Sequence, residues 1–173
     1  MHLEIDVSGS DIFDEHYSIC LSAGEGIIKG FKFDKDLIVN IRKNWKEGKY
    51  TKYPYQPRNQ GVFKTKIYCI IGKLLLKELF DGFNDEVIGV RFCRDFPGHE
   101  DSIKASINHC ITHIHKKKTT KICCAKLPSS SDAHRYAKIM NQDIHNHLGT
   151  YINITLQQIE PFLIWTKKDQ SNI

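Results

Sequence analysis

The stretch LEIDVSGS, residues 3–10, places an aspartate inside an apolar pattern. Leu3, Ile5 and Val7 alternate with Glu4 and Asp6, and a Ser-Gly-Ser sequence follows. Alternation with a period of two predicts a β-strand, and the glycine between serines predicts where it ends. A strand disfavours aspartate, and a buried carboxylate without a partner is costly. Asp6 is therefore a candidate functional residue.

Two more strands and a helix are predicted next. Residues 17–22 and 27–33 are β-branched and aromatic runs separated by Ala-Gly-Glu-Gly, which suits a hairpin turn. Residues 34–45 carry apolar side chains at helical spacing, and Asp34 is placed to cap the helix. The chain is thus expected to open with three antiparallel strands and a short amphipathic helix.

The rest of the chain alternates between helices and strands. Prolines and glycines over residues 46–63 indicate a loop, and residues 151–165 indicate one or two last strands interrupted at Pro161. Between them the patterns predict a long core helix (64–83), a buried strand (86–93), a helix (99–116), a strand (121–127) and a helix (129–148).

Length and composition indicate one domain. The 173 residues, 40% of them hydrophobic, fit the ~100–200 residues that one domain commonly has. The net charge of +5 permits a polyanionic partner without requiring one. The six cysteines form no CxxC pair, which is typical of free thiols in a reducing cytosol. We expect a cytoplasmic protein without membrane contact, because no apolar run approaches the ~20 residues of a membrane span.

The predicted order of elements resembles the ribonuclease H-like superfamily, which includes ribonucleases H, Holliday junction resolvases and retroviral-type integrases. The resemblance covers roughly residues 3–148. The overall pattern is also similar to that of archaeal families with this fold. It implies an α/β fold in which a mixed sheet, three antiparallel strands and then parallel strands, is flanked by helices. The domain would span residues 1–173, with a basic aromatic insertion at about 46–63 and a C-terminal β-like extension at 151–168.

The resemblance also implies a metal site. In that superfamily the metal-binding acids come from the first strand, the end of the fourth strand and the helix after the fifth, where Asp6, Asp95 and Asp132 stand here. Two Mg²⁺ or Mn²⁺ ions held by such oxygen ligands promote phosphodiester hydrolysis. His134 is a candidate proton shuttle or phosphate-orienting residue, and Lys126 is a candidate phosphate contact.

The superfamily pattern is not matched throughout. The first strand reads EIDVSGS, whereas type 2 ribonucleases H have DEAGRG, and the helix over residues 64–83 has no glutamate in its N-terminal half. The later acids of that region, Glu78, Asp81 and Asp85, are expected to lie away from the catalytic end of the sheet. A fourth carboxylate would have to come from Glu4, Glu100 or Asp101.

A basic and aromatic segment predicts a nucleic-acid surface. Residues 42–66 contain eight basic residues, one acid and five aromatic rings. Cations bind phosphates and aromatic rings stack on bases. The candidate contacts are Arg42, Lys43, Trp45, Lys49, Lys52, Tyr53, Tyr55 and Arg58, together with Lys126. The alternative is a solvated loop whose aromatic residues pack back onto the domain.

Simpler roles exist for the aspartates and for a histidine-rich stretch. Asp132 can act as a helix cap or first-turn acid, and Asp95 as a turn residue. His109 and His113 have the helical spacing of a zinc-ligand pair, but Cys110 belongs to the apolar stripe and would point elsewhere. The chain has no phosphate-cradling glycine loop or dinucleotide fingerprint, so no nucleotide cofactor is expected.

The leading hypothesis is a metal-dependent nuclease that hydrolyses phosphodiester bonds in an RNA–DNA hybrid or in a structured or branched substrate. A non-catalytic module of the same fold, which binds nucleic acid or supports an assembly, is the alternative. A third possibility is a different α/β domain in which residues 151–165 supply an edge strand for dimerisation, and the oligomeric state stays open.

Overall fold

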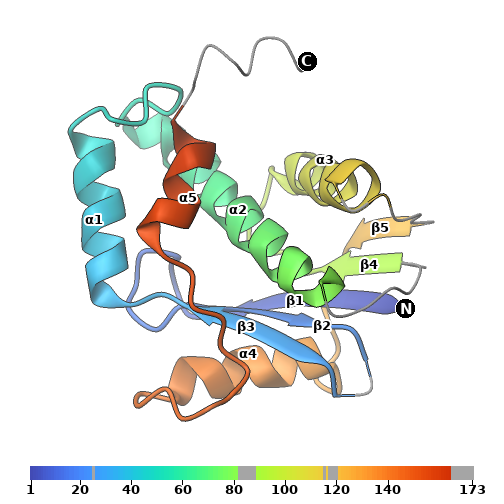
Figure 1. Cartoon of the computed structure of the whole chain (residues 1–173). Coiled ribbons are helices and arrows are strands. Elements are labelled where there is room, and N and C mark those ends of the chain that lie inside the picture. The colour runs from blue at the N-terminus through green and yellow to red at the C-terminus, as the bar shows by residue number, and fades with distance from the viewer. Residues whose placement is uncertain (25, 82–88, 115, 117–120, 165–173) are drawn as a thin grey trace.

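One mixed five-stranded sheet organises the chain, and helices lie on both of its faces (Figure 1). The computed structural model describes residues 1–24, 26–81, 89–114, 116 and 121–164. Within them the strands follow the order β3-β2-β1-β4-β5. Their bounds are β1 His2–Ser8, β2 Ser18–Ser22, β3 Ile28–Lys32, β4 Gly89–Phe92 and β5 Lys121–Cys124. The prediction of an α/β fold is confirmed.

The central strand is β1, and its two neighbours run in different directions. β2 pairs with β1 and β3 with β2 in antiparallel fashion, whereas β4 pairs with β1 and β5 with β4 in parallel. Asp6 lies opposite Cys20 of β2. The backbone N–H of Cys93 donates to the carbonyl of Ile5 at 3.0 Å, which extends the β1–β4 pairing by one residue. The carboxyl ends of β1 and β4 therefore meet at one edge of the sheet.

The helices form two layers around the sheet. Their bounds are α1 Lys35–Lys46, α2 Gln60–Phe80, α3 Glu100–His109, α4 Asp132–Gln142 and α5 Leu156–Leu163, with a 3-10 turn at Pro57–Asn59 and a π-helical turn at Cys110–Ile114. α4 packs on β1, β2 and β3 from one side, and α2 packs on β2 and β3 from the other (Figure 1). No helix in the described ranges has both the length and the apolar character needed to cross a membrane.

Two helix starts follow from local capping. The Asp34 carboxylate accepts a hydrogen bond from the Leu37 backbone N–H at 2.7 Å, as predicted for the start of α1. Ser131 caps α4, because its hydroxyl accepts from the backbone N–H of His134 at 3.3 Å. Asp132 is consequently the first residue of α4 and not its cap.

α4 is shorter than predicted and ends at Gln142. The Asp143 carboxylate then accepts hydrogen bonds from the Leu148 backbone N–H at 3.1 Å and from the Tyr151 hydroxyl at 3.0 Å. Aspartate commonly stabilises turns in this way, and here it holds the segment after α4 in a non-helical path. This segment leads back to the edge of the sheet beside β3.

The predicted β-like extension at 151–168 is wrong for most of its length. Tyr151 makes one isolated parallel bridge with Gly30, and residues Leu156–Leu163 form α5. Thr155 begins this helix with a capping box, and its backbone N–H donates to the Gln158 side chain at 2.8 Å. Pro161 lies inside the helix and does not interrupt a strand. Residues 165–168 of the expected extension lie outside the described residues.

The other boundaries differ from the prediction by a few residues. The expected loop over 46–63 contains the 3-10 turn and the first residues of α2, and the strands β4 and β5 are shorter than expected. Residues 86–88 of the predicted fourth strand lie outside the described ranges, as does residue 115 of the predicted helix 99–116.

Candidate metal centre at the ends of β1 and β4

Donor atoms of Asp6, Cys93 and Asp95 converge at the edge where β1 and β4 end. One carboxylate oxygen of each aspartate and the Cys93 sulfur all lie within 4.8 Å of one another. Parallel pairing places Cys93 beside Asp6, and Asp95 follows two residues later in the turn that ends β4. In the part of the chain that the structure describes, these residues form the only group of three or more such donors.

Asp6 is buried on the central strand and has one clear partner. Asp6 is 5% exposed, and its Oδ2 lies 2.7 Å from Nδ1 of His134 on α4. The His134 side chain is 45% exposed, so this contact joins a buried carboxylate to a partly exposed ring. Since a buried carboxylate needs hydrogen bonds to be tolerated, His134 both stabilises Asp6 and limits its rotation.

The pKa values of the Cys93 thiol and the Tyr17 hydroxyl are raised, because both groups are buried and lie near several carboxylates. Burial, the charge of Asp95, a hydrogen bond to Asp95 and the charge of Asp6 raise the pKa of Cys93 above its usual range. Burial and then the charges of Cys93 and Asp95 raise the pKa of Tyr17. Carboxylates that crowd together repel one another unless a cation offsets their charge. A divalent cation bound between Asp6 and Asp95 would offset this repulsion.

Asp132 does not join the converging group. Its carboxylate lies 3.7 Å from the guanidinium of Arg135 on the same helix. Its charge does contribute, after burial and the charge of Asp6, to the raised pKa of Cys20 on β2. Asp132 is therefore close to Cys20 and paired with Arg135, and the side chain of α4 that contacts Asp6 is His134.

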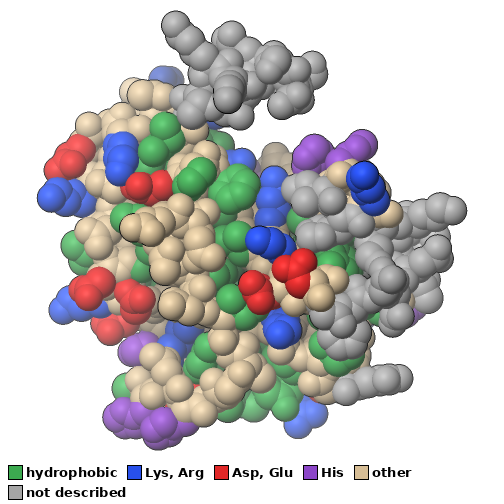
Figure 2. Space-filling view, in the orientation of Figure 1, with side chains coloured by type: hydrophobic (Ala, Val, Ile, Leu, Met, Phe, Trp, Pro, Cys, Tyr) green, Lys and Arg blue, Asp and Glu red, His purple; other side chains and the backbone are tan. Residues whose placement is uncertain are grey.

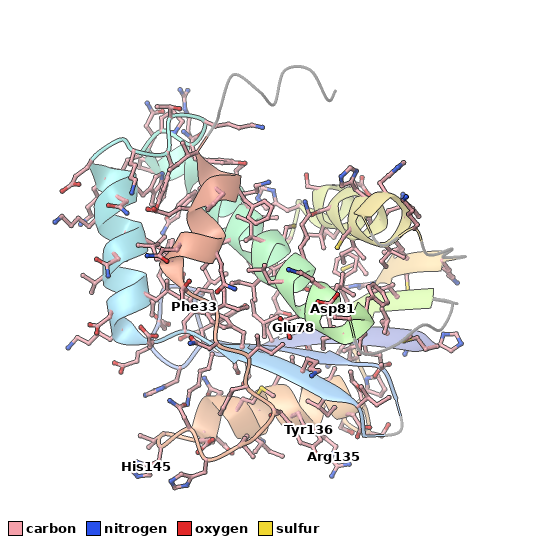
Figure 3. The ribbon with its side chains drawn as sticks, viewed as in Figure 1. Phe33, Glu78, Asp81, Arg135, Tyr136 and His145 are labelled. Carbon is pink, nitrogen blue, oxygen red and sulfur yellow. The ribbon has the colours of Figure 1, made fainter. Side chains whose placement is uncertain are left out.

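The acids considered as substitutes for a fourth carboxylate also lie outside the group. Glu4 accepts a hydrogen bond from the Ser131 hydroxyl at 2.6 Å and pairs with Arg91 at 3.4 Å. Asp101 pairs with Lys104 at 3.2 Å, and Glu100 begins α3. Figure 3 shows Glu78 and Asp81 near the end of α2, on the other side of the sheet from Arg135 of α4. Asp85 lies outside the described residues.

The donor set agrees only partly with two Mg²⁺ ions. Magnesium prefers oxygen ligands in an octahedral arrangement, and a two-ion site needs several carboxylates. Here two carboxylates converge, and the third donor is sulfur. The residues fit one divalent ion better than two.

A pocket of ≈ 310 Å³ opens beside Asp95. Its walls include Lys64 from α2 and Asp11, which form an ion pair. His99 and Ser10 also line it, so the pocket offers hydroxyl, imidazole and ammonium groups next to the converging acids. The carboxylates of Asp11 and Asp95 also line the pocket, so Lys64 would bind an anionic group of a substrate only in exchange for its pairing with Asp11.

The predicted nucleic-acid contacts divide into exposed and buried residues. Tyr55 is 52% exposed, whereas Trp45 and Tyr53 are 4% and 8% exposed and lie in the core. The Trp45 ring stacks on Phe63 with centroids 4.3 Å apart, and its Nε1 donates to the Tyr53 carbonyl at 2.6 Å. The expectation that Trp45 and Tyr53 present their rings to bases is wrong, because both rings fill the space between α1 and α2.

The predicted cations are exposed but not all unpaired. Those exposed to solvent are Arg42, Lys43, Lys49, Lys52, Arg58 and Lys126. Lys49 pairs with Glu160 of α5 at 2.7 Å. Figure 2 shows Lys and Arg side chains interspersed with Asp and Glu around α1, so this face is mixed in charge.

In the histidine-rich stretch, Cys110 lies in the core, as its place in the apolar stripe predicted. The His109 and His113 rings face each other with centroids 5.1 Å apart, while Cys110 is buried in the core. Burial, Lys73 and His113 lower the pKa of His109. A third histidine of this stretch, His115, lies outside the described residues.

Cys93 and Lys64 were not among the site residues predicted from the sequence. A signal for Cys93 was present, because it stands two positions before Asp95, and strand alternation places such residues on one face. For Lys64 the pairing with Asp11 depends on a loop path that the sequence pattern does not reveal.

Comparison with known proteins gives no relative: no family model, no curated protein and no solved structure matches this chain. A functional assignment therefore depends on the geometry of the site itself.

Proposed function

We propose that the protein is a metal-dependent nuclease with a ribonuclease H-like fold, which hydrolyses phosphodiester bonds in nucleic acid. The observation that carries this proposal is the convergence of Asp6 and Asp95 from two adjacent parallel strands, with His134 of α4 bonded to Asp6. The strand order, with β1 central between an antiparallel and a parallel neighbour, supports the fold assignment.

In this proposal Asp6 and Asp95 hold a divalent ion. When bound, such an ion activates a water nucleophile and neutralises charge on the phosphate. In this role His134 keeps the Asp6 carboxylate in position through Nδ1, and its partly exposed ring would exchange a proton with the substrate through Nε2. Nδ1 of His134 is taken to carry a proton, because the Asp6 carboxylate can only accept a hydrogen bond.

Substrate binding in this proposal uses the pocket and the exposed cations. Lys64 in the pocket would contact a phosphate next to the scissile bond, in exchange for its pairing with Asp11. Tyr55 remains exposed for stacking, and the Lys46 ammonium lies 5.9 Å from the centre of its ring. An RNA–DNA hybrid or a structured or branched nucleic acid presents both phosphates and accessible bases.

A second candidate is a non-catalytic module that binds nucleic acid or supports an assembly. The pairing of Asp132 with Arg135 favours it, because only two carboxylates then remain at the site. Loss of one acid is compatible with retained binding through the exposed cations.

Cleavage of end-labelled substrates tests the proposal. RNA–DNA hybrid, four-way junction and single-stranded substrates are incubated with Mg²⁺, Mn²⁺ or Zn²⁺ and with the wild type, Asp6→Asn or Asp132→Asn. We expect cleavage that Asp6→Asn abolishes and that Asp132→Asn largely retains, because only Asp6 belongs to the converging group. Binding of nucleic acid without cleavage under any of these conditions would favour the second candidate.

A further inference from the structure

The position of Cys93 bears on which metal the site takes. The sulfur lies within 4.8 Å of carboxylate oxygens of both Asp6 and Asp95. The hydrogen bond from its own backbone N–H to Ile5 fixes Cys93 beside Asp6 in the sheet. Cys93 is 5% exposed, so the packing around it holds its side chain in place. The sulfur is therefore a built-in part of the site.

Sulfur changes the preference of a metal site. Mg²⁺ is a hard ion that takes oxygen ligands, whereas zinc and similar transition metals readily combine thiolate, imidazole and carboxylate donors. Catalytic zinc sites typically have three protein ligands and one open position. Asp95 is exposed and lines the pocket, so the open side of the group faces a space that a substrate can enter.

We propose that this site binds one zinc-type transition-metal ion through Asp6, Cys93 and Asp95. The inference rests on the proposed function in treating the group as a metal centre, and it names the ion: a single thiol-binding transition metal in place of the two Mg²⁺ or Mn²⁺ ions expected from the sequence.

The geometry is compatible with such an ion. Bonds of ~2.0–2.2 Å to oxygen and ~2.3 Å to sulfur place the donors of a tetrahedral site ~3.3–3.8 Å apart. The donors here lie within 4.8 Å of one another, so small side-chain rotations bring them to that spacing. His134 supplies the hydrogen bond from an outer residue that commonly orients a metal-binding carboxylate.

The hydroxyl of Tyr68 provides an independent observation next to the site. Tyr68 is buried on α2, and its hydroxyl has no hydrogen-bond partner among the described residues. Its ring packs against Phe96 with centroids 4.7 Å apart, and burial together with the charges of Cys93, Cys69, Tyr17 and Asp95 raises its pKa. A buried donor without an acceptor is costly, and a ligand bound at the metal would provide one.

Cobalt binding tests the inference without a nuclease assay. Co²⁺ is titrated into the metal-free full-length protein, and absorption spectra report sulfur-to-cobalt charge transfer and the number of ions bound. We expect one Co²⁺ per chain with a sulfur charge-transfer band, displacement by Zn²⁺, and no displacement by a large excess of Mg²⁺. Cys93→Ser should remove the band and weaken binding more than ~10-fold, since even an outer-residue change costs ~10–100-fold.

Cys20→Ser is the matched control. Cys20 is buried on β2 and lies on the other side of Asp6 from Cys93, but its sulfur is outside the converging group. This variant should keep the cobalt spectrum. If Cys93→Ser fails to fold, the wild-type spectrum and the Mg²⁺ competition decide the question.

Several results would overturn the inference: cobalt bound without a sulfur band in the wild type, a band that survives Cys93→Ser, two ions per chain, or displacement by Mg²⁺. The two proposals fail separately. A cobalt–sulfur site without nuclease activity contradicts only the proposed function, and Mg²⁺-dependent cleavage by a protein without that site contradicts only the zinc-type centre.

Discussion

Removal of the His134 side chain should destabilise the protein measurably, even without metal. The Nδ1 of His134 lies 2.7 Å from an oxygen of Asp6, which is 5% exposed. A hydrogen bond to a carboxylate contributes ~1.5–3 kcal/mol, and the higher helix propensity of alanine offsets about 0.5 kcal/mol of its loss. His134→Ala is therefore expected to lower the free energy of unfolding by about 1–2.5 kcal/mol.

Urea unfolding followed by circular dichroism measures this change, provided that the denaturant slope stays constant. For a chain of this length the melting temperature should fall by ~2–10 °C. Arg135→Ala is the matched control on the same helix. Arg135 makes only an i,i+3 pair with Asp132 at 3.7 Å and is exposed, so its removal should cost less than ~0.5 kcal/mol.

A double-mutant cycle with Asp6→Asn isolates the contact itself. If His134 acts through Asp6, the two substitutions should couple by at least ~1 kcal/mol. A His134→Ala variant no less stable than Arg135→Ala, or effects of His134→Ala and Asp6→Asn that simply add, would show that the contact between His134 and Asp6 does not stabilise the protein.

Two other predictions address the aromatic segment and the contact between α1 and α5. Trp45→Ala should destabilise the protein by ~3–5 kcal/mol in urea unfolding, because a buried aromatic ring is lost. Tyr55→Ala removes a ring that is 52% exposed and packs edge-on against Trp45 with centroids 4.8 Å apart, so it should cost only ~0.5–1.5 kcal/mol. The same variant should weaken binding of a fluorescent oligonucleotide by ~1–3 kcal/mol in anisotropy titrations. Burial acts to raise the pKa of Glu160, but hydrogen bonds from Lys49, Tyr50 and the Asn44 side chain and the charge of Lys49 lower it overall. The stability that this lowered pKa contributes is complete above the unfolded glutamate pKa of ~4.3 and is lost as pH falls through the lower folded pKa. In urea titrations, the stability advantage of the wild type over Glu160→Gln should therefore shrink across that pH range. An advantage that does not change with pH would contradict this prediction.

Local patterns predicted most of the elements because they depend on neighbouring residues. Alternation identified β1, and apolar spacing with Asp34 identified α1, since both features depend on one face of one element. α5 was missed, although Thr155 and Gln158 have the spacing of a capping box. The β-branched residues before Thr155 suggested a strand, but α5 packs against α2 and α1 and buries Ile159 and Leu163 on one face, which favours a helix.

The aromatic segment shows where composition stops being informative. Cations and rings in one segment are equally consistent with a binding surface and with a core under a charged exterior. Burial decides between them, and it depends on where α1 lies relative to α2, which the local sequence does not specify. Trp45 and Tyr53 face inward because Phe63 of α2 meets them, while Tyr55 lies beyond that contact.

Whether Asp132 or His134 contacts Asp6 depends on the rotation of α4 about its axis. Ala133, Ala137 and Met140 form its buried stripe, and neighbouring helix positions are ~100° apart, so residues 132 and 134 leave the helix on opposite flanks of that stripe. The flank of His134 meets Asp6, and the other flank carries Asp132, whose charge acts on Cys20. Asp132 accordingly stays outside the converging group. An acid in the correct helix is therefore a weaker indication of a metal site than an acid in the correct rotational position, and in this helix histidine occupies that position.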